Sequence, residues 1–286
     1  MKILNTLEDD FPCPASSTVN SRKYYEAFLK AEEILKATPT KHKEAAENSL
    51  AELTSYFYSE GDTTQALYRK QETASDVLVG LWLSEVRNIA NWYAAANSTP
   101  IFKGIDKSTL VSLPRNFKEP KNLKRIEPFL ANEGVIFVYK NAFPAMKLDG
   151  AVFSIPSGQI VVALSLRYSR LDYFWFTLLH ELAHVVLHAD HLNSPIIDNL
   201  EITSASIQEK QADRLALDSL IPRNEWRSCP ARFTHSSADV INFANRLGIP
   251  AQCVAGRLQR ELNRYELFAE IINEFNVKEI LGADKQ

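Results

Sequence analysis

Two histidines and a glutamate, in the sequence His180-Glu181-Leu182-Ala183-His184, have types and a spacing that suit metal chemistry. At 3.6 residues per turn, His180 and His184 lie about one turn apart on one helical face, so both imidazoles can reach one cation. Glu181 adjoins that face, where its carboxylate can take a proton from a metal-bound water. Because bound Zn²⁺ lowers the pKa of water toward about 7, the pattern predicts a zinc site that makes a nucleophile at neutral pH.

A catalytic zinc site needs a third protein ligand and an open fourth position. A helix predicted over 206–219 offers Glu209, with Asp213 one turn later. In this arrangement Glu209 binds the metal, while Asp213 accepts a hydrogen bond from the distal nitrogen of a ligand histidine and fixes its tautomer. Glu201, in the polar connection before the helix, is the alternative third ligand; we prefer Glu209.

Further polar residues near the motif are candidates for secondary roles. Arg167, Tyr168 and Tyr173 could orient a peptide or stabilise an oxyanion, since metallopeptidases need such a donor. Tyr173 suits a core position equally well, and the sequence does not choose. His188 and His191 diverge from the motif face around the helix and are interpreted as histidines that do not bind the metal.

A small sheet is predicted directly before the metal-binding helix. The apolar, β-branched segments that form it are 134–139, 151–155 and 159–165. The strand at 159–165 is either an exposed edge, to which an extended peptide could add, or a buried central strand. Ser169 and Asp172 form a predicted capping box that opens the motif helix.

Helices are predicted on both sides of this region. Apolar residues recur at helical spacing over 21–58, with a break at Thr38-Pro39-Thr40 that indicates a hairpin, and again over 64–97. The predicted helices after the motif lie near 206–219, 237–247, 250–263 and 265–275. The sequence thus predicts an α+β fold, with a helical N-terminal region at 1–97 and a second domain at 98–286.

The segment 98–128 separates these two parts. Its prolines are expected to interrupt any long element. Its basic residues form a local positive face that we interpret as solvated surface in preference to a phosphate site; they are Lys118, Lys121, Lys124 and Arg125.

Composition limits the compartment and the partners. Of the 286 residues, 45% are hydrophobic and 23% charged, which is typical of a globular chain, and the net charge of −3 gives no global attraction to nucleic acid or anionic membranes. The three cysteines are far apart and lack a C-x-x-C spacing, which argues against disulfides or a cysteine zinc site. The N-terminus lacks a positive region followed by an apolar core, and the apolar runs are too short to span a membrane. We therefore expect a cytoplasmic protein.

Two segments resemble the ImmA/IrrE family of metallo-endopeptidases. HELAHVVLH at 180–188 is similar to the family's HELxHxxLH helix, and EKQADRLALDSLIP at 209–222 to its E-x-x-A-[ND]-x-x-A-x-x-L-[IM]-P segment. The similarity covers roughly 75–262. ALSLRYSRLDYFWFTLLHELAHVVLH and DGAVFSIPSGQIVV further resemble the branch attached to HigA-type, Xre-containing antitoxin proteins, and 20–58 resembles more weakly a segment of that branch.

The resemblance implies a zincin-like fold with His180, His184 and Glu209 on Zn²⁺ and Glu181 as general base. Family members act on repressor-type regulators in prophage, toxin–antitoxin or stress-response circuits. One departure is the lack of a helix-turn-helix between 58 and 130, so direct nucleic-acid binding is not expected and a separately encoded Xre-type partner is favoured.

Two hypotheses follow. The leading one is zinc-dependent endopeptidase activity on a regulatory protein encoded nearby. The alternative is a non-catalytic, antitoxin-like binding module that acts by binding an Xre-type protein or a toxin.

Overall fold

The computed structural model describes residues 21–37, 50, 54, 58, 74–143, 146–189, 192, 196–198 and 207–283. The chain divides into two compact units, Met1–Glu85 and Val86–Gln286. The predicted hairpin break at 38–40 and the residues His191 and Glu201 lie outside the described part. The predicted domain boundary after residue 97 stays a prediction.

In the first unit, helix α1 covers Ser21–Ala37 and helix α5, Ala74–Asn97, begins here and continues into the second unit. Tyr24, Ala27 and Ala31 of α1 are buried at helical spacing. The ring of Tyr24 also meets the ring of Tyr58 edge-on, with centroids 5.4 Å apart. These contacts confirm the helical prediction for 21–37, and α5 confirms it for 74–97.

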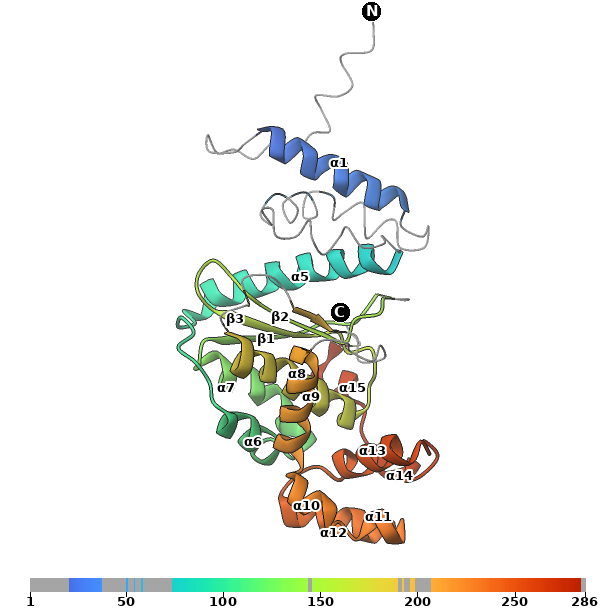
Figure 1. Ribbon diagram of the computed structural model, residues 1–286. Coiled ribbons are helices and arrows are strands. Elements are labelled where there is room, and N and C mark those ends of the chain that lie inside the picture. The colour runs from blue at the N-terminus through green and yellow to red at the C-terminus, as the bar shows by residue number, and fades with distance from the viewer. Residues whose placement is uncertain are drawn as a thin grey trace, which may run out of the picture. The chain divides into compact units, whose positions relative to one another are not determined.

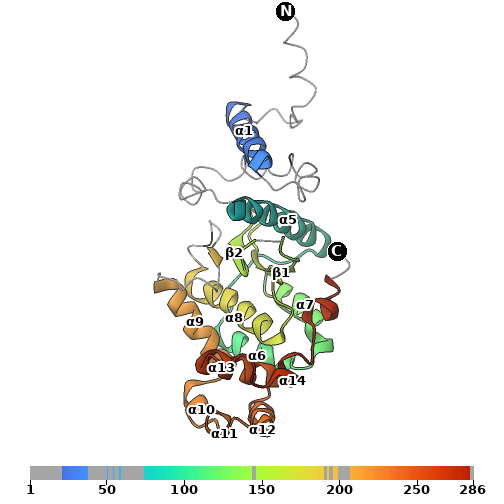
Figure 2. The same cartoon turned by 90° about the vertical axis from the view of Figure 1, so that its right-hand side faces the viewer.

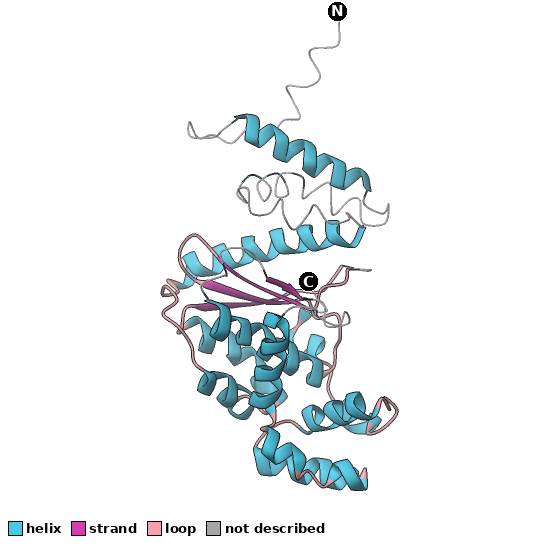
Figure 3. Cartoon of the chain, viewed as in Figure 1, coloured by secondary structure: helices cyan, strands magenta, loops and turns pink. Residues whose placement is uncertain are grey.

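The second unit contains a four-stranded sheet among helices (Figure 3). Its strands are β1 (Val135–Tyr139), β2 (Gly150–Ser154), β3 (Ile160–Leu164) and β4 (Ile196–Asp198), in the order β1-β3-β2-β4. Strand β3 pairs parallel with β1 and antiparallel with β2, and β2 pairs antiparallel with β4. The buried central position of β3 is thereby confirmed. The alternative of an exposed edge at 159–165 is wrong, because hydrogen bonds to two neighbours leave β3 no free edge.

The two faces of the sheet are covered by different helices (Figures 1 and 2). Since side chains alternate along a strand, Phe137, Val152 and Val162 share the face that joins the main core with α8, Leu171–His188. Phe153 lies on the opposite face, where the guanidinium of Arg87 in α5 stacks 5.0 Å from its ring centroid.

Helix α8 is buried on almost every side. It packs against β2, β3, the helix α6 (Lys107–Asn116) and two helices of the C-terminal part, α9 (Ile207–Leu220) and α13 (Ala251–Leu262). Its composition, LDYFWFTLLHELAHVVLH, is apolar around the whole circumference, as expected for a central helix. Polar groups on α8 are therefore enclosed by the protein, which decides where its chemistry can occur.

The start of α8 differs from the predicted capping box. The N-cap residue is Arg170, not Ser169, and it makes no side-chain cap. Asp172 instead accepts two hydrogen bonds from the Arg170 guanidinium, at 2.9 and 2.8 Å, so its carboxylate does not reach back to the backbone. A bidentate pair with arginine is stronger than a neutral cap, which explains the difference.

The proline-rich segment forms short helices that were not predicted. They are α6, the 3₁₀ helix η2 (Pro120–Arg125) and α7 (Ile126–Ala131). Pro120 and Pro128 lie in first turns, where a proline costs no intrahelical hydrogen bond. Pro114 lies near the end of α6.

The C-terminal part is helical. Helices α12 (Ser237–Leu247) and α13 confirm two predictions, and α10 (Arg223–Arg227), α11 (Ala231–Thr234) and α15 (Val277–Leu281) were not predicted. The helix predicted over 265–275 is wrong, because only α14, Ala269–Ile272, is helical there. The left-handed residues Asn263 and Phe268, at φ 52° and 57°, stop a continuous helix. The chain is thus mixed α+β, as predicted. None of the described helices combines the length and apolar composition that crossing a membrane requires.

The core position of α8 yields a stability prediction. Leu179 is fully buried, so Leu179→Ala removes packed methyl groups and should lower the free energy of unfolding by about 2–5 kcal/mol. Leu187 of the same helix is 36% exposed, and Leu187→Ala should change that energy by less than about 0.5 kcal/mol. Urea denaturation of both variants measures the difference; equal losses would contradict the central placement of α8.

Candidate metal centre

Helices α8 and α9 lie side by side and run in opposite directions. Glu209, near the start of α9, contacts His180 and His184, and Asp213, one turn later, contacts His180. A later residue of α9 therefore contacts an earlier residue of α8, as expected for antiparallel helices. This antiparallel pairing brings together residues that are about 30 positions apart in the sequence.

Three ligand-type atoms converge between the two helices. Nε2 of His180 lies 3.0 Å from Nε2 of His184 and 3.1 Å from Oε2 of Glu209, and the remaining edge, His184 to Glu209, is 3.4 Å. Tetrahedral ligands about 2.0–2.2 Å from a zinc ion lie roughly 3.3–3.6 Å from one another. The three atoms thus form a face close in size to that of a zinc site, and the group could hold a metal ion.

Asp213 determines which histidine nitrogen is available. Its Oδ1 lies 2.9 Å from Nδ1 of His180. In a neutral imidazole one nitrogen donates and the other carries a lone pair, so donation from Nδ1 to Asp213 leaves the Nε2 lone pair directed at His184 and Glu209. When the ring is neutral, a cation bound by Nε2 takes the place of the proton that a charged His180 would share with Glu209.

The carboxylate of Glu209 is ionised at neutral pH. Burial of the side chain raises its pKa, but hydrogen bonds and charge interactions with His180 and His184 outweigh burial and lower the pKa to about 2. A carboxylate ligand must be deprotonated to bind a metal, and this one already is.

Glu181 is fully buried and lies against strand β2. A Cβ atom added at Gly150 would approach Oε1 of Glu181 closely and would lie 2.7 Å from its Cδ. Only glycine therefore leaves room for this carboxyl group beside the sheet. The sequence motifs do not point to Gly150; the signal that could have found it is an isolated glycine at a strand start, which often marks a close approach of another group.

The predicted oxyanion candidates form a separate cluster. Arg167 donates to Asp149 at 3.1 Å, and its guanidinium lies 5.3 Å from the ring centroid of Tyr168, whose ring in turn lies 4.5 Å from that of Tyr173. Tyr173 precedes His180 by seven residues, which is about 10 Å along the helix axis. The structure thus brings these three residues together, two turns away from the ligand group.

His188 was predicted to diverge from the face of the helix that carries the motif. This prediction is wrong. Its ring lies 5.5 Å from the ring of His184, because position 188 continues the row formed by positions 180 and 184. It is not one of the three residues whose ligand atoms converge.

A comparison with protein families identifies the domain that contains these residues. Residues 133–259 match the model of the IrrE N-terminal-like domain, a peptidase family. The chain contains an ImmA/IrrE-family domain. The matched segment begins just before β1, ends within α13 and includes all three ligand-type residues, Glu181 and Asp213. The predicted family is confirmed, and its peptidases are metallopeptidases in kind. The HigA-type branch stays a prediction, and no curated protein matches the chain.

The geometry of His180, His184 and Glu209 predicts that this site binds one divalent metal ion. Metal-loaded protein should be stabilised, by about 2.7 kcal/mol at a free metal concentration of 100 times Kd. His184→Ala and Glu209→Gln should abolish both metal retention and the stabilisation. Elemental analysis and thermal unfolding with and without a chelator measure these effects.

Glu225→Gln serves as the control, because Glu225 pairs with Arg246 at the surface, on α10. Metal retained by Glu209→Gln as firmly as by this control would show that the three converging atoms do not bind the ion.

Proposed function

We propose that this protein is a cytoplasmic, zinc-dependent endopeptidase that cleaves a regulatory protein. The observation that carries the proposal is the convergence of His180, His184 and Glu209 beside the buried carboxyl group of Glu181. Two nitrogens and one carboxylate oxygen are a ligand set typical of catalytic zinc, which leaves the fourth position for solvent or substrate. The family match to a peptidase domain supports the same class of reaction.

Each residue of the proposed site has its own role in the reaction. A Zn²⁺ ion held by His180, His184 and Glu209 would polarise the scissile carbonyl group and acidify the attacking water. Glu181 accepts the proton of that water on its carboxylate and later donates it to the leaving amine. Asp213 keeps Nδ1 of His180 protonated, so that Nε2 stays available as a ligand.

The substrate that we propose is a repressor-type regulator or a component of a toxin–antitoxin, prophage or stress circuit, encoded near this gene. The resemblance of the motif segments to the HigA-associated branch supports an Xre-type protein. The net charge of −3 supports a protein partner over direct binding of nucleic acid.

The role of Glu181 is tested by Glu181→Gln. The amide keeps the size of the side chain but cannot accept the proton, so we expect hydrolysis to fall by about 10²–10⁴-fold while folding and metal content stay unchanged. The measurement is mass spectrometry of proteins encoded beside this gene after incubation with the wild-type protein or the variant.

A truncated product that forms equally fast with both proteins would refute the general base. A stable complex without any truncated product, unaffected by the substitution, would instead favour the non-catalytic binding module.

The packing of Glu181 against Gly150 gives a second test. Gly150→Ala places a methyl group where the carboxyl group now lies, so Glu181 must move, and a displacement of about 1 Å costs on the order of 10² in rate. Metal content should not change, because the metal-binding residues lie on other elements. Ser154→Ala, at the other end of β2, is the matched control. Unimpaired hydrolysis in Gly150→Ala would show that this contact does not position the base.

A further inference from the structure

An apolar pocket lies between helices α8, α9 and α13. It has a volume of about 110 Å³ and is partly open to solvent, and its residues come from all three helices. Most of the wall is apolar; the lining residues that form it are Phe176, Leu217, Leu220, Ile221 and Cys253. A small pocket of this composition suits one apolar side chain of a ligand.

The pocket begins one helical turn from the candidate metal centre. On α8, Phe176 precedes His180 by four residues, and their ring centroids are 6.1 Å apart. On α9, Leu217 follows Asp213 by four residues, and Asp213 contacts His180. Because one turn is about 5.4 Å, a group bound at the metal would have its neighbouring side chain within reach of the pocket.

A guanidinium stands at the rim of the pocket. The Arg260 side chain lies 4.7 Å from the ring centroid of Phe176 and 5.9 Å from that of Tyr173. It is exposed, and within the described part of the chain it forms no ion pair with a carboxylate. Stacking holds the positive charge in place beside the apolar wall, where it can pair with an anionic group of a ligand.

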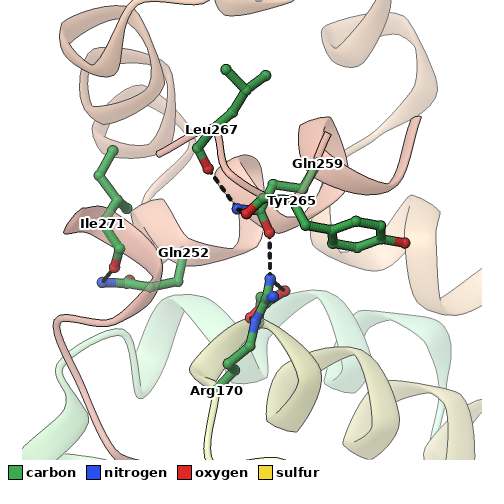
Figure 4. A network of polar contacts seen from close by, with 7 residues as sticks. Arg170, Gln252, Gln259, Tyr265, Leu267 and Ile271 are labelled. Atoms are coloured by element: carbon green, nitrogen blue, oxygen red, sulfur yellow. Dashed lines mark hydrogen bonds and ion pairs between the residues drawn. The ribbon is translucent and has the colours of Figure 1, made fainter. Parts of the chain in front are cut away.

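A half-buried polar network links Asp172, which lines the pocket, to Arg170 and Gln259; Figure 4 shows the bond between Arg170 and Gln259. Arg170 binds Asp172 and donates to Oε1 of Gln259 at 2.8 Å, and Nε2 of Gln259 donates to the main-chain oxygen of Leu267 at 2.5 Å. The Asp172 carboxyl group lies against Gly256, where an added Cβ would be 2.6 Å from its Cγ. The network ties α13 to the start of α8, so the pocket is formed before any ligand binds.

We propose that this pocket is the subsite for the substrate residue next to the scissile bond. It takes a branched aliphatic or aromatic side chain, and Arg260 pairs with a carboxylate that follows this residue in the substrate. The inference rests on the proposed peptidase function, because it needs a scissile carbonyl group at the metal.

The test measures binding of small chelators to zinc-loaded protein by calorimetry. The probes are acetohydroxamate, a succinyl hydroxamate without a side chain, and the same succinyl hydroxamate with an isobutyl group, each succinyl probe made as the free carboxylate and as the amide. Burial of the isobutyl group should tighten binding by roughly 10- to 100-fold over the probe without it. The carboxylate should bind about tenfold more tightly than the amide.

Variants test which residue produces each of these two increases in affinity. In Leu217→Arg, and in the uncharged Leu217→Phe, the probes with and without the isobutyl group should bind almost equally tightly. The ratio of their dissociation constants should fall to about one. In Arg260→Gln the preference for the carboxylate should disappear while the isobutyl gain remains. Ile241→Arg, at an exposed position of α12, should retain both gains.

The outcomes separate the subsite from the metal centre. If acetohydroxamate binds but isobutyl gives no gain, or if the gain survives in both Leu217 variants, the subsite is refuted and the peptidase proposal stands. If the wild-type protein neither retains zinc nor binds acetohydroxamate, the proposed function fails, and the subsite with it.

Discussion

The packing of α9 along α8 is the interaction on which the rest of this structure depends. Helix α8 is enclosed by the sheet and by other helices, yet it carries Asp172, His180, Glu181 and His184 in its sequence. A buried polar group without a partner costs several kcal/mol, so such a helix is stable only if its neighbours satisfy these groups. Helix α9 does this for both ring nitrogens of His180, through Glu209 and Asp213, and Glu209 also lies 3.4 Å from Nε2 of His184.

Two glycines leave room for the two carboxylates of α8. Gly150 on β2 leaves room for Glu181, and Gly256 on α13 leaves room for Asp172. The first contact holds a carboxyl group close to the sheet beside the ligand group, and the second joins the C-terminal helices to the start of α8. Both contacts are between segments remote in sequence, so neither is visible as a local motif.

This arrangement places the proposed reaction at a boundary between polar and apolar surfaces. The row of positions 172, 176, 180 and 184 on α8 runs from a half-buried ion pair, past an aromatic wall, to the ligand group. A polypeptide lying along this row would meet a site for its carbonyl group and a site for its side chain one turn apart. Selection of a substrate and activation of water would then use the same two helices, which the ImmA/IrrE domain supplies.

The sequence by itself determined the candidate ligand residues and the local elements that carry them. The spacing of His180 and His184 requires a helix, Glu209 and Asp213 follow at one-turn spacing, and the apolar segments before them predict three strands and their approximate bounds, because these features depend on helical and strand periodicity. Tertiary structure decided the rest. It made β3 central, paired Asp172 with Arg170 in place of a cap, and set Arg167, Tyr168 and Tyr173 apart from the ligands. It also created the pocket beside Phe176, because long-range packing, which no local pattern records, selects among conformations that local propensity leaves nearly equal in energy.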